Sequence, residues 1–170
     1  GGIRPMEQTD IPSVLAIQKP FVEAQKLLPR TEQQLSAELS DFIVYEVDGG
    51  VHACAALHLY SDTGVGAGRG DSNVSGGDSE CVCGWNQGEI AAVAVEQKFD
   101  HMGIGAKMIH FLIEKAKKQQ LKSVFILTTQ AADVFEKLGF KPDDISTLPQ
   151  KRKEKWSPER NSKLFRLDLQ

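Results

Sequence analysis

Gly103 and Gly105 stand where a strongly apolar segment gives way to a helical pattern. Residues 88–95, just upstream, are almost continuously small or β-branched, which is typical of a strand buried on both faces. Glycines let the backbone approach a ligand closely, and the start of a helix offers unpaired N–H groups with a partial positive charge. The arrangement is a common way to hold a phosphate, although a glycine at a helix start can also mark a simple tight turn.

Glu89, within that apolar segment, is a candidate for acid–base chemistry. A carboxylate on a buried strand beside a ligand site can accept a proton from a reacting group. The alternative is an ion-paired carboxylate at the end of a strand. The four histidines have no ligand-like spacing with cysteines or carboxylates, so we expect no metal site.

The end of the chain is basic although the whole chain has a net charge of −3. Residues 151–170 contain seven basic and three acidic side chains. Such a patch favours a small anionic ligand at least as readily as a polyanion, and the acidic whole argues against a nucleic-acid binder. Arginine pairs well with carboxylates because its guanidinium can donate two parallel hydrogen bonds.

The first half of the sequence predicts two helices and a hairpin. Thr9-Asp10 can cap a helix that Pro20 stops or kinks. Thr31, followed by Gln34, forms a capping-box pattern for a second helix. The period then changes to two, and Asp48-Gly49 predicts a tight turn between strands at residues 42–47 and 51–60. A Gly- and Ser-rich loop insert follows at residues 61–87.

The second half predicts the elements that would position the candidate residues. After the strand at 88–95 and a loop at 96–102, a helix runs to about residue 119, and a buried strand covers 123–129. A short helix closes at Gly139, and alternating Phe165, Leu167 and Leu169 predict a last strand with one covered face. The order indicates an α/β (α+β) fold with a mixed sheet, organised as a single domain over residues 1–170.

Composition excludes several classes of protein. The chain has 170 residues, of which 41 % are hydrophobic and 25 % charged, as in ordinary globular domains. No apolar run approaches the roughly 18 residues that span a bilayer, so we expect no membrane partner. Three cysteines without metal-ligand spacing are typical of reduced thiols, which predicts a cytoplasmic location or an organelle matrix. Gly1-Gly2 in place of an initiator Met fits an excised, processed or tagged chain.

The sequence resembles the GCN5-related N-acetyltransferase (GNAT) family around the two glycines. That family binds the diphosphate of acetyl-CoA on a Q/R-x-x-G-x-G/A loop, which here reads Asp100-His101-Met102-Gly103-Ile104-Gly105-Ala106. Both glycines match, but Asp100 stands where the family has Gln or Arg. An acidic side chain beside a diphosphate should weaken binding unless it turns to solvent.

A narrower resemblance is to the acetyltransferase domain of the N-acetylglutamate synthases. It extends over about residues 3–169, without the insert. Seven short motifs carry it in order: Leu28-Pro29-Arg30-Thr31, Cys54-Ala55-Ala56-Leu57, Gly88-Glu89-Ile90-Ala91, Leu127-Thr128-Thr129, Phe135 with Gly139-Phe140, Leu148-Pro149, and Arg160-Asn161-Ser162-Lys163.

This resemblance implies a fold and a set of site residues. The sheet would be mostly antiparallel, splayed between its fourth and fifth strands and flanked by helices. Glu89 would be the base, Thr128 would lie near the thiol, and the Ala92–Val93 backbone would bind the oxyanion. The residues implied to bind acetyl-CoA are Val93, Ala94, Val95, His101, Met102, Gly103, Ile104, Gly105, Ala106 and Phe135. The residues implied to bind the acceptor are Leu28, Arg30, Ala92, Arg152, Arg160 and Ser162.

The implied activity is N-acetylation of L-glutamate, the first step of arginine biosynthesis, by direct attack in a ternary complex. Two alternatives stay open: an acetyltransferase for another amino acid, an amine or a protein N-terminus, and a weakly active ligand-sensing domain. The family also allows an upstream amino-acid-kinase-like domain or a homo-oligomer as partner.

Overall fold

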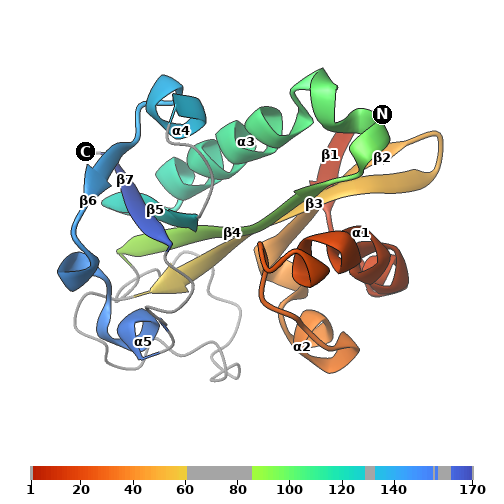
Figure 1. Ribbon diagram of the computed structural model, residues 1–170, viewed down its shortest axis with the longest axis horizontal. Helices are drawn as coiled ribbons and strands as arrows, with labels where there is room; N and C mark the ends of the chain where they lie inside the picture. Colours follow the sequence, from red (N-terminus) through yellow and green to blue (C-terminus); the bar gives the residue numbers. More distant parts are fainter. Residues whose placement is uncertain (1, 61–85, 129–132, 155, 157–161, 170) are drawn as a thin grey trace. The chain divides into compact units, whose positions relative to one another are not determined.

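A computed structural model describes residues 2–60, 86–128, 133–154, 156 and 162–169, with backbone only at 100, 101, 133 and 134 (Figure 1). The strands are β1 (Gly2–Pro5), β2 (Phe42–Val47), β3 (Gly50–Tyr60), β4 (Gln87–Val95), β5 (Ser123–Thr128), β6 (Lys141–Asp143) and β7 (Lys163–Asp168). The α-helices are α1 (Ile11–Glu23), α2 (Glu32–Ala37), α3 (Ile104–Lys118), α4 (Asp133–Lys137) and α5 (Gln150–Lys153). Short 3₁₀ helices are η1 (Gln8–Asp10), η2 (Leu39–Asp41), η3 (Gln97–Met102) and η4 (Ile145–Thr147).

The strands form one mixed sheet in the order β1-β2-β3-β4-β5-β7-β6. Strands β4 and β5 are parallel, whereas the pairs β1–β2, β2–β3, β5–β7 and β6–β7 are antiparallel. The β4–β5 ladder joins Gln87–Glu89 to Ser123–Phe125, and no further β4–β5 pair occurs among the described residues. The predicted α/β fold, with a mostly antiparallel sheet flanked by helices, is confirmed.

The chain divides into two compact units, which we describe separately. Unit 1 comprises Gly1–Leu57 and Ile90–Leu112, and unit 2 comprises His58–Glu89 and Ile113–Gln170. In unit 1 the predicted β2–β3 hairpin is present, with Asp48 at φ 52° and Gly49 at φ 82°. Two consecutive residues with positive φ match the twist of the paired strands, which explains the Asp-Gly pair.

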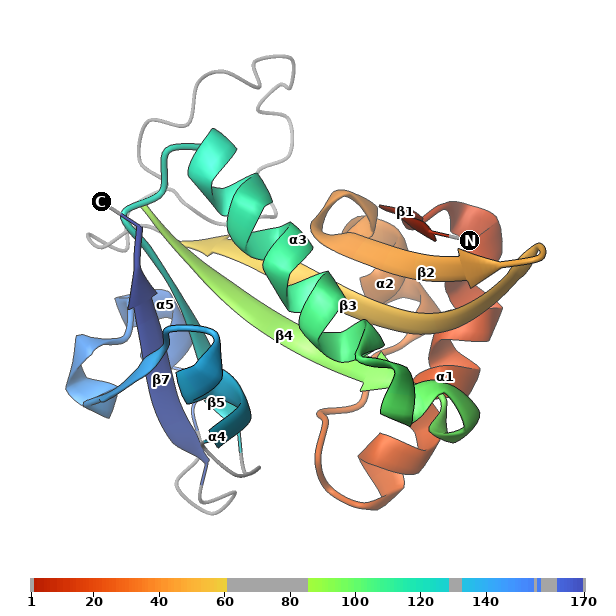
Figure 2. The ribbon, with the colours of Figure 1, turned by 90° about the horizontal axis from the view of Figure 1, so that it is seen from above.

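The core of unit 1 lies between the sheet and its helices. Alternate side chains of β2, β3 and β4 point to the same face as the apolar stripe of α1 and Leu35 of α2. Figure 1 shows α1 and α2 on that face and the start of α3 on the other, and Figure 2 gives the same arrangement from above. This core contains Met6, Ile11, Val14, Ile17, Leu35, Phe42, Val44, Cys54, Ala56, Ala92 and Ala94.

Two predictions for the first helices have different outcomes. The Thr31 capping box is confirmed, because the Thr31 hydroxyl accepts from the Gln34 N–H at 3.1 Å and the Gln34 side chain accepts from the Thr31 N–H at 2.8 Å. Of the stop or kink predicted at Pro20, the stop does not occur. Helix α1 continues to Glu23, and the Pro20 carbonyl still accepts a bond from the Ala24 N–H at 3.0 Å. Proline removes one hydrogen bond and its ring crowds the carbonyl four residues earlier, yet here the helix continues for three more residues.

In unit 2, Leu164 and Phe165 of β7 are both buried, although they point to opposite faces of the strand. The prediction of one covered face is therefore wrong. The Phe135 ring of α4 stacks on Phe165, while Leu148 packs with Leu164 and Phe125. Helices α4 and α5 accordingly cover opposite sides of β5, β7 and β6 (Figure 1).

Three short elements, β1, β6 and α5, were not predicted from the sequence. The predicted insert also ends earlier than expected, since β4 already begins at Gln87. Residues 61–85 lie outside the described part of the chain. Their flanks meet in a hydrogen bond from the Asn86 N–H to the Tyr60 carbonyl, at 2.9 Å. None of the helices that the structure describes has the length and apolar character needed to cross a membrane.

Candidate active site

The two glycines lie where the sequence placed them, at the start of α3. Gly103 ends η3 with a φ of 72°, a left-handed conformation that favours glycine. The first helical bond of α3 joins the Lys107 N–H to the Gly103 carbonyl at 3.1 Å. The N–H groups of residues 104–106 precede that bond, so the helix itself gives them no acceptor. They are donors suited to an anion.

Gly105, at the start of the helix, lies close to the end of β4. A Cβ added there would lie 3.8 Å from Val95 and 3.9 Å from Val93, within ordinary contact distance. Val93 and Val95 are half-buried, whereas Ala92 and Ala94 face the core. Small strand residues beside first-turn N–H donors fit a long, thin ligand arm attached to a diphosphate, as in acetyl-CoA. The Ile104 side chain is buried, so only its backbone is available to such a ligand.

A positive φ interrupts β4 at Ala92. Its φ is 57°, which is uncommon for a residue with a Cβ and marks local strain. The Cys54 thiol donates to the Ala92 carbonyl at 3.4 Å, and the Gln18 amide donates to the Cys54 sulfur at 3.6 Å. Burial raises the pKa of the Cys54 thiol to about 11, which keeps it protonated and able to donate. This chain of contacts fixes the backbone on which the oxyanion role was expected.

Sequence reasoning missed Gln18 and Cys54, although one signal was present. Gln18 follows Val14 by four residues and Ile11 by seven, which places it on the apolar stripe of α1. It is 1 % exposed, and its Oε1 has no hydrogen-bond partner among the residues described. A polar residue on an apolar stripe predicts a buried contact.

Glu89 and Arg152 form a buried ion pair in unit 2. Arg152 Nε donates to Glu89 Oε1 at 2.8 Å, and the two side chains are 10 % and 6 % exposed. Glu89 comes from β4, and α5 delivers Arg152 through a first turn in which the Arg152 N–H bonds to the Pro149 carbonyl at 2.9 Å. The structure shows Glu89 ion-paired within β4 rather than at its end, and its role as a base stays a prediction.

The pair fixes the charge of Arg152. Burial alone would lower the pKa of Arg152, but the Glu89 charge, its hydrogen bond and the nearby Tyr60 hold that pKa above its ordinary value. Arg152 is thus a permanent buried cation and not part of a solvated basic face. Removing either partner of such a pair leaves an uncompensated buried charge, which costs about 3–5 kcal/mol.

In unit 1, Arg30 and Leu28 lie in the segment between α1 and α2. Arg30 Nε is 3.9 Å from Glu38 Oε1, beyond hydrogen-bond distance, and its guanidinium stacks over the Phe42 ring at 5.8 Å. The Arg30 side chain is 17 % exposed. Leu28 is 45 % exposed, unusual for a large apolar residue. Arg30 is therefore a cation that is only weakly paired with Glu38 and that packs against the Phe42 ring.

The other expected site residues vary in their environment. Thr128 ends β5 opposite Lys163 and is half-buried, as is Ser162. Phe135 is 5 % exposed and packs against Phe140 and Phe165, so its ring is a core side chain. Met102 and Ala106 are exposed. Arg160 and the side chains of Asp100 and His101 lie outside the described part of the chain.

The turn before Gly103 has its own anchor in unit 1. Nδ1 of His52 lies 2.5 Å from the Glu96 carboxylate, and the Glu96 N–H donates to the His52 carbonyl at 2.9 Å. The His52 and Phe99 rings lie 4.4 Å apart. These contacts tie η3 to β3 and thereby set where the glycine loop begins. Among the described His, Cys, Asp and Glu residues, no group of three is placed to hold a metal ion.

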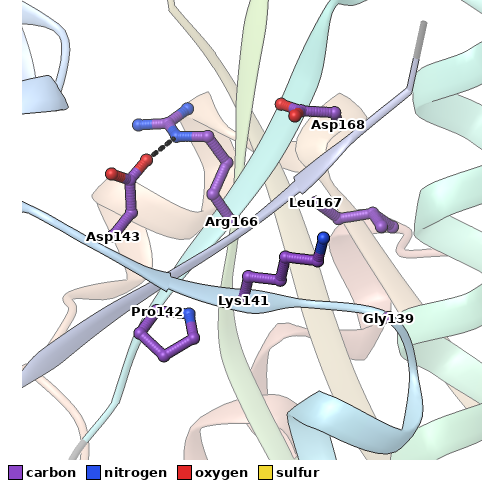
Figure 3. Close-up of a pocket in the computed structure, with 7 residues that line it drawn as sticks. All are labelled: Gly139, Lys141, Pro142, Asp143, Arg166, Leu167 and Asp168. Carbon is purple, nitrogen blue, oxygen red and sulfur yellow. Dashed lines mark hydrogen bonds and ion pairs between the residues drawn. The ribbon is translucent and has the colours of Figure 1, made fainter.

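A hollow of about 390 Å³ lies along β6 and β7 in unit 2 (Figure 3). It shares no residue with the expected site. Arg166 at its wall is already hydrogen-bonded to Asp143, Gln87, Ser123 and Thr147. A guanidinium whose donors are taken up in this way is a structural support, so we assign the hollow no ligand.

Comparison with known proteins identifies the family. The model of the acetyltransferase (GNAT) family matches residues 10–140. The chain therefore belongs to the GNAT acetyltransferases, a family that uses acetyl-CoA. The glycine loop, the interrupted β4 and the β4–β5 pair all lie within this match.

More particular similarities are to enzymes that acetylate amino acids. The chain is 30 % identical over 160 residues to the amino-acid acetyltransferase of Pseudomonas fluorescens (strain Pf0-1), covering 94 % of this chain and 32 % of that protein. It is 27 % identical, with a TM-score of 0.78, to N-acetylglutamate synthase from Neisseria gonorrhoeae complexed with coenzyme A and N-acetyl-glutamate, over 99 % of this chain and 35 % of that one.

A Mycobacterium tuberculosis protein solved with CoA shares the fold over the full length of both chains, at 22 % identity and a TM-score of 0.74. By contrast, this chain spans about a third of the length of the curated amino-acid acetyltransferases it matches.

Proposed function

We propose that this chain transfers the acetyl group of acetyl-CoA to the α-amino group of L-glutamate. The buried Glu89–Arg152 pair is the observation that carries the proposal. It places a carboxylate, which can bind an amine, next to a permanent cation, which can bind a carboxylate. An α-amino acid has both of these groups. The 27 % identity to N-acetylglutamate synthase from Neisseria gonorrhoeae complexed with coenzyme A and N-acetyl-glutamate supports the same acceptor.

In this proposal unit 1 holds the coenzyme. The N–H groups of residues 104–106 and the αL turn at Gly103 bind the diphosphate, and the backbone of residues 93–95 pairs with the pantetheine amides. When bound, acetyl-CoA supplies an activated acetyl thioester. The Ala92–Val93 backbone donates to the thioester oxygen, and the Cys54 thiol holds the Ala92 carbonyl on the opposite side.

Charged side chains bind the acceptor and take up its proton. Glu89 takes a proton from the α-ammonium, directly or through a water, so that the amine nitrogen can attack the thioester carbon. As the carbon–sulfur bond breaks, the Thr128 hydroxyl hydrogen-bonds to the departing sulfur. Arg152 holds the α-carboxylate, while Arg30, Arg160 and Ser162 hold the side-chain carboxylate. Leu28 and Ala92 add backbone contacts.

The extent of the functional unit is also a proposal. Residues 1–170 would form one acetyltransferase domain, with residues 61–86 inserted between two of its strands. The partners that we propose are small molecules, acetyl-CoA and glutamate. An amino-acid-kinase-like domain upstream, or a second copy of the chain, is compatible with this arrangement.

Thiol release from acetyl-CoA, measured with a panel of amino acids and amines, tests the proposal. We expect L-glutamate to react faster than glycine, lysine or glutamine, and mass spectrometry of the product should show N-acetylglutamate. Equal rates for all α-amino acids would reduce the conclusion to a general amino-acid acetyltransferase. Tight binding of acetyl-CoA without any acetyl transfer would instead indicate a ligand-sensing domain.

A further inference from the structure

The proposed function asks two things of the Glu89–Arg152 pair that conflict in the structure. Glu89 must be free to accept a proton, and Arg152 must be free to bind a carboxylate, yet Nε of one donates to Oε1 of the other at 2.8 Å. The Oε1 atom that accepts this hydrogen bond is not available at the same time to the ammonium of an acceptor. In the structure, one carboxylate oxygen of Glu89 and one donor of Arg152 are therefore already engaged with each other.

An α-amino acid carries the matching pair of charges on a single carbon. Its carboxylate can replace Glu89 at the guanidinium while its ammonium approaches the released Glu89 oxygen. Four charges of alternating sign then replace two, and no buried charge is left without a partner. An amine that lacks the carboxylate brings one extra positive charge, and it cannot draw Arg152 away without leaving that cation unpaired.

Resting on the proposed function, we propose that the acceptor's own α-carboxylate releases the base: it takes the Arg152 guanidinium from Glu89, so that only α-amino acids are acetylated. Arg152 therefore determines the class of acceptor as well as its affinity. The side-chain carboxylate plays no part in this step and is selected elsewhere.

The burial of the pair makes the exchange selective. Both side chains are at most 10 % exposed, so bulk water does not screen them as it would a surface pair. On an exposed surface water would solvate either partner, and an amine without a carboxylate would find the base already free.

The test compares L-glutamate with 4-aminobutanoate, which is glutamate without its α-carboxylate. In the unaltered protein we expect kcat for 4-aminobutanoate to be lower by about two orders of magnitude, the size expected when a buried charge loses its partner. In Arg152→Gln, kcat for 4-aminobutanoate should rise several-fold while that for glutamate falls, so that the ratio approaches one.

Lys153→Gln is the matched control, because it removes an adjacent, exposed positive charge from the same helix. It should leave the ratio of the two kcat values unchanged. A wild-type ratio retained in Arg152→Gln overturns the proposal, since a merely structural role would slow both acceptors alike. Comparable rates for both acceptors in the unaltered protein overturn it too, while leaving the acetylation of glutamate intact.

Failure of the proposed function gives a different pattern. If glutamate is inert but another α-amino acid reacts, the comparison moves to that amino acid and its decarboxylated amine, and a ratio that Arg152→Gln abolishes still supports the inference. If no acceptor reacts, calorimetry with the CoA-loaded protein decides: glutamate should bind at least ten-fold more tightly than 4-aminobutanoate, and only while Arg152 is present. Equal binding of the two ligands overturns the inference.

Discussion

Replacing Arg166 with methionine should destabilise unit 2 strongly, because that single side chain joins four strands. Its Nε donates to Asp143 at 2.8 Å, and Nη1 donates to Gln87 at 2.7 Å and Ser123 at 3.0 Å. Nη2 reaches the Thr147 hydroxyl at 3.0 Å, and the guanidinium lies 5.3 Å from the centre of the Phe125 ring. Methionine retains most of the aliphatic stem but supplies none of these donors.

The loss of stability depends on whether each former partner of Arg166 is buried or exposed to water. Gln87 and Ser123 are buried, and a buried polar group that loses its partner costs about 1–3 kcal/mol. Asp143 has a 31 % exposed side chain, so water replaces much of what it loses. We therefore expect a decrease of about 3 kcal/mol in the free energy of unfolding, taking the lower half of that range for each of the two buried groups. For a chain of this size that lowers Tm by about 6–12 °C.

The pH dependence of the loss provides a second signature. Burial tends to raise the pKa of Asp143, but hydrogen bonds from the Asp144 N–H and Arg166 outweigh it and hold that pKa below its ordinary value. A depressed carboxyl pKa contributes stability above the unfolded value of about 3.9, and the contribution disappears as the pH falls through the native pKa. The difference between wild type and Arg166→Met should therefore shrink below about pH 4.

Urea unfolding at pH 7 and at pH 3.5 measures both effects. Lys141→Met is the control, because Lys141 is exposed and faces Arg166 across the β6–β7 ladder. It should change the free energy of unfolding by no more than about 0.5 kcal/mol. A loss below about 1 kcal/mol for Arg166→Met, or an equal loss for the control, would refute the role of Arg166 as a link between strands.

Three further predictions concern local features. Thr31→Ala should lower the free energy of unfolding by about 1 kcal/mol in urea titrations, because it removes the capping box of α2. Deleting residues 63–83 and closing with a short Gly/Ser turn should leave Tm and acetyl transfer intact, because Tyr60 and Asn86 already meet in a hydrogen bond. Asp100→Arg should tighten acetyl-CoA binding in calorimetry by about tenfold, since it replaces repulsion of a diphosphate by attraction.

The sequence predicts best where a feature is local. The Asp48-Gly49 turn, the Thr31 capping box and Gly139 after α4 each depend on a few adjacent residues. At Gly139, φ is 99°, and the Phe140 N–H bonds back to the Phe135 carbonyl at 3.0 Å, which is the helix ending that glycine favours. Because these conformations depend on the preferences of a few adjacent residues, the sequence alone was enough to predict them.

Long-range contacts account for most of what the sequence did not predict. Arg166 alternates with Phe165 and Leu167, so the pattern predicts an exposed side chain. In the structure, however, Arg166 donates a hydrogen bond to Gln87, 79 residues earlier. The edge strands β1 and β6 have only four and three residues, too few to show a period. Helix α5 is one turn long. Short edge elements are stabilised by their neighbours in the sheet and carry little signal of their own.

The candidate site shows the same division. The glycine loop was visible because its residues are adjacent, and the structure places it at the start of α3 as predicted. The contact between Glu89 and Arg152 spans 63 residues, and the sequence offered each of them a separate role. Nothing in either local pattern says that a buried carboxylate and one residue of a basic run are partners. Only the fold brings the two together.

Strand β4 is where these two kinds of information combine. A residue with a Cβ held at positive φ costs about 1 kcal/mol or more, so Ala92 would relax to ordinary strand geometry unless its surroundings held it. Cys54 and Gln18 supply that restraint from β3 and α1, with a thiol whose raised pKa keeps its proton in place. The restraint acts at the peptide on which the proposed reaction places its oxyanion donors. In the function that we propose, the strain held at Ala92 fixes the direction of the backbone N–H groups assigned to the oxyanion.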